Sequence, residues 1–140
     1  MNFDMIGPAI VMGLGCLGSA IGCGIAGMAS HAIMSRFDEG HAKFIALSAI
    51  PSSQSIYGLI LMVMMKNAIK GGTLTGVSAI GIGFVVGLAL IASALYQGKC
   101  CATAIQAAAK QPAIYGKTLV SITIIESFAL FAFVFALLLM

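Results

Sequence analysis

Long apolar runs separated by short polar segments make up most of this chain. Four such runs cover Met5–Met34, Ala42–Met65, Gly76–Ala109 and Thr118–Met140. Each is longer than the ~20 residues that an α-helix needs to cross the hydrocarbon core of a bilayer. The pattern predicts an all-α membrane protein with four transmembrane helices and three short loops.

The composition agrees with this prediction. The chain is 61% hydrophobic and only 8% charged, which lies outside the range of soluble domains. Most of the charge falls between the apolar runs, in residues 35–41, 66–76 and 110–117. The net charge of +3 is not gathered into a basic patch, so we expect no nucleic-acid partner. Any function must therefore lie within the membrane.

The basic residues favour one orientation, because Lys and Arg accumulate on the cytoplasmic side of membrane proteins. The first and third loops are flanked by Arg36, Lys43, Lys110 and Lys117, and the second by Lys66 and Lys70. We expect the first and third loops to face the cytoplasm and both termini to face outward.

The first half of the chain resembles the second half. A shift of 74 residues pairs Gly13-Leu14 with Gly87-Leu88, Ser19-Ala20 with Ser93-Ala94, Arg36 with Lys110 and Lys43 with Lys117. We expect two duplicated helical hairpins, residues 1–72 and 73–140, with the second carrying the functional carboxylate. Two hairpins that enter from the same side are parallel repeats about an axis along the membrane normal. This symmetry suits assembly into a homo-oligomeric ring.

Small residues distinguish the first and third predicted helices from the other two. Gly18 and Gly22 are four residues apart, as are Gly83 and Gly87, a spacing that lets helix backbones approach closely. The second and fourth runs carry bulky Ile, Leu, Met and Phe side chains instead. We expect the first and third helices to form a crowded inner layer and the others an outer layer.

One carboxylate, Glu126, stands in the last apolar run, within SITIIESFALFAF. An ionisable group at mid-span costs at least ~2.5 kcal/mol on insertion scales and usually marks function. It lies nine residues after Lys117, or about 14 Å of helix. Gln54 and Gln97 lie about 16 and 20 Å from the same membrane face, counted from Lys43 and Lys110. These polar side chains are predicted to meet near the middle of the membrane.

The second run adds oxygen ligands near Gln54, in the stretch IPSSQSIYG at residues 50–58. Pro51 has no backbone N–H, so it frees carbonyls and is expected to expose that of Ile50 by bending the helix. Ser53 supplies a hydroxyl, and the hydroxyl of Tyr57 is placed to reach a carboxylate on a neighbouring helix. A carboxylate with amide, hydroxyl and carbonyl oxygens favours a hard cation. Taken singly, the proline, serines, glutamines and tyrosine also fit a kink or helix packing.

With these motifs the sequence resembles the membrane rotor subunit, also called proteolipid or K, of V-type and A-type rotary ATPases. The resemblance covers essentially the whole chain and rests on IPSSQSIYG, on YQGK at 96–99 and on IIES at 124–127. In sodium-translocating members, what looks like the same motif binds Na⁺. The positions that the resemblance assigns are Glu126, Gln54, Gln97, Ser53 and the carbonyl of Ile50 as ligands, with Tyr57 holding the carboxylate.

The sequence differs from the sodium-binding pattern at one position. Sodium-translocating members typically have Thr where this chain has Ser53, so the hydroxyl is kept and a methyl is lost. Ser52 stands where the shift of 74 residues would place a second carboxylate, which resembles the V-type pattern of one ion per four helices.

The resemblance implies a rotary mechanism in a prokaryotic cell membrane. Identical subunits would form a ring in lipid, a stator membrane subunit of the a/I type would load and unload each Glu126, and central-stalk subunits would meet the cytoplasmic loops. The chain itself would be a non-catalytic part of the ATPase or ATP synthase. Five oxygen ligands exceed what a proton needs, so we favour Na⁺ over H⁺ as the transported ion.

Two other classes are compatible with four spans and one carboxylate. A small secondary transporter would need a roomy substrate site with aromatic lining, often including Trp, and this chain has no Trp. A structural membrane-organising protein would use Glu126 only for hydrogen bonding. The size of the detergent-solubilised protein separates the three classes.

Overall fold

The computed structural model describes residues 3–140, and within them all regular structure is helical. The first span is α1 (Ile6–Met34). The second is interrupted and consists of α2 (His41–Ala49), the 3₁₀ turn η1 (Ile50–Ser52) and α3 (Ser53–Lys70). The third is α4 (Gly76–Lys110), and the fourth is η2 (Pro112–Ile114) followed by α5 (Tyr115–Leu138). All four spans are long and apolar enough to cross a membrane, which confirms the predicted fold class.

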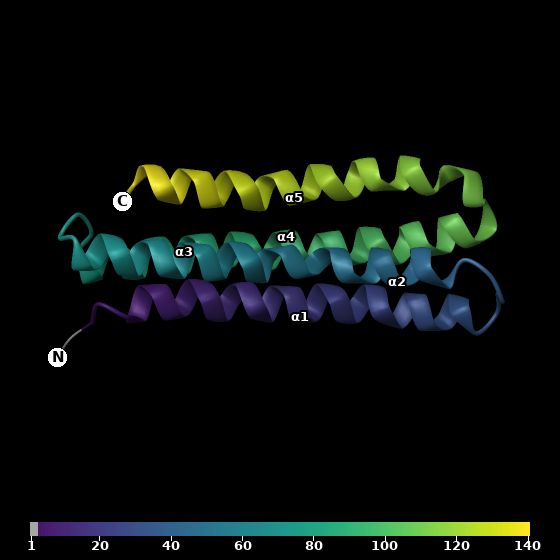
Figure 1. Cartoon of the computed structure of the whole chain (residues 1–140), viewed down its shortest axis with the longest axis horizontal. Helices are drawn as coiled ribbons and strands as arrows, with labels where there is room; N and C mark the ends of the chain where they lie inside the picture. The colour runs from purple at the N-terminus through teal and green to yellow at the C-terminus, as the bar shows by residue number, and fades with distance from the viewer. Residues whose placement is uncertain (1–2) are drawn as a thin grey trace.

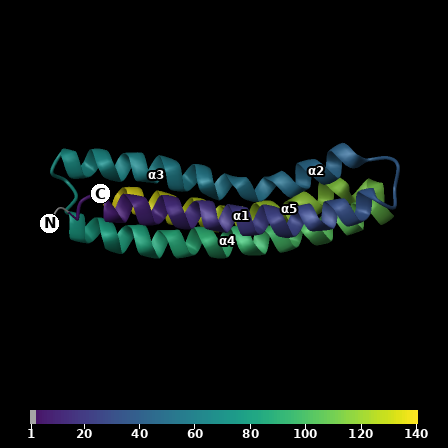
Figure 2. The ribbon, with the colours of Figure 1, turned by 90° about the horizontal axis from the view of Figure 1, so that it is seen from below.

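The four spans lie side by side along their length (Figure 1). α1 and α5 occupy opposite sides of the bundle, with α3 and α4 between them, as the two perpendicular views show (Figures 1 and 2). The most extensive contacts join α1 to α4, while α3 leans mainly on α1 and α5 mainly on α4. The N- and C-terminal ends lie at the same end of the bundle (Figure 1).

Glycines allow the close packing of α1 against α4. A Cβ atom built on Gly22 would overlap the carbonyl oxygen of Ala94, and one built on Gly98 would lie 2.6 Å from the Cα of Gly22. Such distances leave no room for a side chain, so the two backbones touch directly at this crossing. The crowding predicted for the first and third helices is therefore present within a single chain.

The helix boundaries differ from the sequence prediction at two places. The charged segment 110–117 predicts a loop, but only Gln111 separates α4 from the 3₁₀ turn that begins at Pro112. Proline is tolerated at the first position of a helical turn, where its missing N–H is not needed, so the chain re-enters helix at once. The second span also continues past Met65 to Lys70, because Lys66, Ala68 and Lys70 are good helix formers whether or not they lie in the membrane core.

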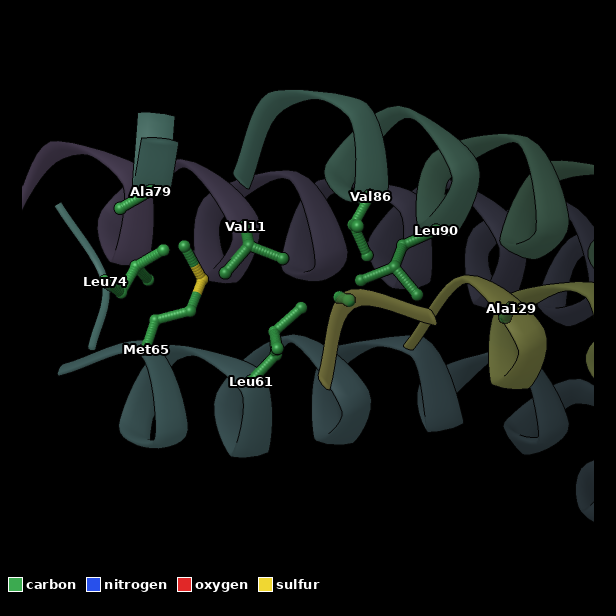
Figure 3. Close-up of a cluster of buried hydrophobic side chains, with 9 residues drawn as sticks. Val11, Leu61, Met65, Leu74, Ala79, Val86, Leu90 and Ala129 are labelled. Atoms are coloured by element: carbon green, nitrogen blue, oxygen red, sulfur yellow. The ribbon is translucent and has the colours of Figure 1, made fainter. Parts of the chain in front are cut away.

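Two buried apolar clusters lie on either side of a polar layer. One cluster lies toward the termini, where Leu61 and Met65 of α3 point toward Val11 of α1 (Figure 3). The other lies toward the opposite end and consists of Ala26, Phe44, Leu47, Cys101, Ala104, Ile105, Ala108 and Ile122. Between them four polar side chains are buried within the spans: Ser19, Gln54, Ser93 and Gln97. This polar layer is the candidate functional region of the bundle.

Candidate functional site

The second span breaks where the sequence places proline. α2 ends at Ala49, the 3₁₀ turn at residues 50–52 includes Pro51, and α3 begins at Ser53. Just beyond the break, the backbone N–H of Ser55 donates to the hydroxyl oxygen of Ser19 on α1, at 2.9 Å. This bond across the bundle holds the start of α3 against the glycine-rich helix. The bond therefore restrains the position of α3 relative to α1 at the break.

Two glutamines from different spans meet beside the break. Gln54 and Gln97 are both fully buried, and the Nε2 of Gln54 donates to the Oε1 of Gln97 at 3.1 Å. The same Nε2 donates to the hydroxyl oxygen of Ser93 at 3.2 Å. Buried amides cost free energy unless they are hydrogen-bonded, and these two satisfy each other across the α3–α4 contact.

Glu126 of α5 joins this pair. Its Oε2 accepts from the Nε2 of Gln97 at 3.5 Å, and its Oε1 accepts from the hydroxyl of Tyr57 on α3 at 3.2 Å. The Tyr57 ring packs against Phe133, with ring centroids 5.9 Å apart, which limits its movement. Each carboxylate oxygen is thus held by a donor from a different helix. An ionised carboxylate offers about four acceptor sites, so each oxygen retains capacity for a further ligand.

Ser53 and Ile50 lie next to this network. The Ser53 hydroxyl donates to the Oε1 of Gln54 at 3.3 Å. The carbonyl of Ile50 accepts from the backbone N–H of Ser53, as expected for a 3₁₀ turn, and a carbonyl oxygen has a second lone pair. The side chains singled out from the sequence therefore form one hydrogen-bonded chain from Ser53 to Tyr57. The carbonyl of Ile50 lies one turn away, beside this chain rather than in it.

The chemistry of this cluster suits a hard cation. The ligand atoms it could offer are those of a carboxylate, two amide oxygens, a hydroxyl and a backbone carbonyl, all of them oxygen. No group of three or more His, Cys, Asp or Glu side chains that could hold a metal ion occurs among residues 3–140. A single carboxylate surrounded by neutral oxygens matches the charge of a monovalent ion better than that of a divalent one.

Two members of the polar layer were missed from the sequence. Ser19 and Ser93 are nearly fully buried, and both make hydrogen bonds between helices. The signal was present in the duplication, because the shift of 74 residues pairs these two serines. Spacing alone gave no reason to prefer them over serines that bond only to their own helix.

Four helices long enough to cross a membrane, with one carboxylate held by hydrogen bonds among them, define the class, an integral multi-pass membrane protein with a candidate cation site. The chain belongs to the ATP synthase C-subunit family, whose sequence model matches residues 6–65 and again residues 80–139. Both ends of the second match are offset from the first by 74 residues, which confirms the duplicated hairpin.

Two characterised relatives extend the comparison. The chain is 36% identical over 138 residues to the A-type ATP synthase subunit K of Methanocaldococcus jannaschii, covering 97% of this chain and 62% of that protein. It is 26% identical over 141 residues to the V-type sodium ATPase subunit K of Enterococcus hirae, covering 99% of this chain and 90% of that protein. The chain thus spans about three fifths of the length of the first relative.

Proposed function

We propose that this chain is a rotor-ring subunit of an A-type or V-type rotary ATPase and that it carries Na⁺ on Glu126. The observation that carries the proposal is the network of hydrogen-bonded polar side chains from three spans that ends on one carboxylate between two apolar clusters. The relatives support it, because one is named as a subunit of an A-type ATP synthase and the other of a V-type sodium ATPase.

In this proposal the residues of the site divide into ligands to the ion and one residue that holds the carboxylate. The ligands to Na⁺ are Glu126, Gln54, Gln97, Ser53 and the backbone carbonyl of Ile50. Tyr57 keeps the carboxylate in place through its hydroxyl. Na⁺ must recover from these oxygens most of the hydration that it loses on entering the membrane. The alternative ion is H⁺, which needs only the carboxylate and one hydrogen-bond partner.

Rotation follows from the cost of an uncompensated charge. An ionised Glu126 facing hydrocarbon is expensive, and a bound cation neutralises it. In a ring of identical copies, a stator membrane subunit would load each carboxylate from one side and unload it toward the other. Between these two events the neutralised site travels through lipid. Glu126 thereby permits rotation past lipid only when it is occupied.

The ends of the bundle face different partners in this arrangement. We place the loop containing residues 35–40 and the turn at Gln111 in the cytoplasm, because Arg36, Lys43, Lys110 and Lys117 lie near them. The loop and the turn would contact the central stalk there. Both termini lie at the other end of the bundle (Figure 1), and in this orientation they face outward. We divide the chain into hairpins at residues 1–72 and 73–140.

Glu126→Gln tests the role of the carboxylate in the reconstituted complex. The amide keeps the shape of the side chain but removes its charge, so we expect ATP-driven ²²Na⁺ uptake into vesicles to fall to background. Detergent-solubilised rings should keep the wild-type size. Normal uptake by this variant would exclude Glu126 as the ion carrier.

A further inference from the structure

Ser19 and Ser93 are equivalent positions of the two hairpins, yet their bonds differ. Each lies on the first, glycine-rich helix of its hairpin and ties it to the second helix of the same hairpin. Ser19 accepts from the backbone N–H of Ser55, whereas Ser93 donates to the backbone carbonyl of Ile125 on α5, at 3.1 Å. Ser93 also accepts a bond from the side chain of Gln54, which belongs to the other hairpin.

The bonds of Ser93 have a fixed direction. A backbone carbonyl can only accept, so the hydroxyl proton of Ser93 is committed to Ile125 and its oxygen faces Gln54 with lone pairs. Gln54 must then present its NH₂ group to Ser93. The Oε1 of Gln54 consequently points the other way, toward the Ser53 hydroxyl.

Gln97 is oriented by the same logic. Its Nε2 donates to the backbone carbonyl of Ile122 at 3.4 Å, which fixes its Oε1 on the side of Gln54. Two backbone carbonyls of α5, those of Ile122 and Ile125, therefore determine the direction in which the oxygen of each buried amide points. Gln97 is oriented by its own bond to an α5 carbonyl. Gln54 is oriented through Ser93, whose hydroxyl donates to another α5 carbonyl and accepts from the NH₂ group of Gln54.

We propose that Ser93 is a positioning residue for Na⁺ binding, which holds the amide of Gln54 with its oxygen turned toward the ion and its NH₂ turned away. This inference rests on the proposed function of the same site. The orientation matters because the carbonyl end of an amide attracts a cation and the NH₂ end repels it. Without Ser93, the amide of Gln54 keeps only the Oε1 of Gln97 as an acceptor for its NH₂ group, so its orientation is held less firmly.

The test is protection of Glu126 from carbodiimide by Na⁺ in assembled rings. Ser93→Ala removes both bonds of the hydroxyl, and loss of the one from Gln54 predicts that the Na⁺ concentration for half-protection rises about three- to tenfold. The labelling rate without Na⁺ should keep its wild-type value and pH profile, because the described bonds of Ser93 go to Gln54 and Ile125 rather than to Glu126. A purely structural defect would change the labelling rate as well.

Three comparisons make the test specific. Ser30→Ala is the matched control, because the Ser30 hydroxyl is buried on α1 without a hydrogen-bond partner among the described residues, and we expect wild-type half-protection. Ser93→Thr should retain tight Na⁺ binding while Ser93→Val loses it. These two side chains have the same shape, so the pair isolates the hydroxyl even if the added methyl weakens both rings. In the Gln54→Ala background, Ser93→Ala should have no further effect.

The outcomes separate this inference from the proposed function. Wild-type labelling that is indifferent to Na⁺ would overturn both. Wild-type protection that is equalled by Ser93→Ala, or additive effects of Ser93→Ala and Gln54→Ala, would overturn the positioning role alone. Equal loss of Na⁺ binding in the Thr and Val variants would also overturn it, because the hydroxyl would then be irrelevant.

Discussion

Glu126 is held at both of its carboxylate oxygens, by Tyr57 on one and Gln97 on the other. Its side chain is half-buried in the single chain, between an apolar core and the exposed face of α5. This position lets an ion enter from the surface of the bundle and find oxygens on its inner side. The residue therefore has the access and the partners that reversible binding requires.

The two buried glutamines give a prediction at the scale of the residue. Gln54→Ala or Gln97→Ala should raise the Na⁺ concentration that protects Glu126 from carbodiimide by roughly 10- to 100-fold, as removal of groups that support a metal site commonly does. Gln106→Ala is the control, because Gln106 is exposed on α4, away from the polar layer. Unchanged protection in both glutamine variants would mean that the amides only join helices.

The sequence was sufficient to select most of this site, because a polar side chain stands out in an apolar run. Glu126, Gln54, Gln97, Tyr57 and Ser53 were visible for this reason, and the structure joins them by hydrogen bonds. Ser93 was not visible, because a serine in a helix commonly bonds to its own backbone. Only the three-dimensional contact with Ile125 and Gln54 distinguishes it.

At the scale of the element, the four spans follow directly from the apolar runs, while their ends do not. The charged residues at 110–117 suggest a loop, but charge marks the edge of the membrane rather than the end of a helix. The sequence predicts that Pro51 bends the second span, and Pro51 occupies a 3₁₀ turn between α2 and α3. Its effect on the backbone is predictable because it is local, whereas the bond from Ser55 to Ser19 depends on tertiary packing.

The contact between α1 and α4 gives a prediction at this scale. Gly22→Leu should prevent assembly, and even Gly22→Ala should weaken it, because a Cβ atom there would overlap the Ala94 carbonyl and approach the Cβ of Pro51 to 2.7 Å. Gly24→Ala is the control, since a Cβ at Gly24 meets nothing within 4 Å in the described chain. The measurement is the yield and thermal stability of detergent-solubilised rings. Normal rings from Gly22→Leu would show that α1 and α4 do not pack this closely.

The whole molecule leaves large apolar side chains uncovered. Phe128, Phe131 and Phe135 of α5 are more than half exposed in the single chain. In a membrane protein such a surface contacts lipid or another protein. In a ring of copies it would contact neighbouring copies on some sides and lipid on the others. The duplicated hairpin gives the chain two similar halves, which suits repeated side-by-side packing.

The size of the solubilised protein tests this assembly. A rotor subunit should migrate in mild detergent as one large ring of fixed mass, measured by native mass spectrometry. A secondary transporter would give a dimer, and a membrane-organising protein no fixed size. Either of the latter results would contradict the rotor proposal.

Carbodiimide labelling of Glu126 in wild-type rings across a range of Na⁺ concentrations tests directly whether this carboxylate binds Na⁺. At a fixed, mildly acidic pH, we predict that millimolar Na⁺ suppresses labelling. The suppression should weaken as the pH is lowered, because protons compete with Na⁺ for the same carboxylate. Labelling that stays constant over the whole range of Na⁺ would show that Glu126 does not bind Na⁺ and would identify the site as a proton carrier.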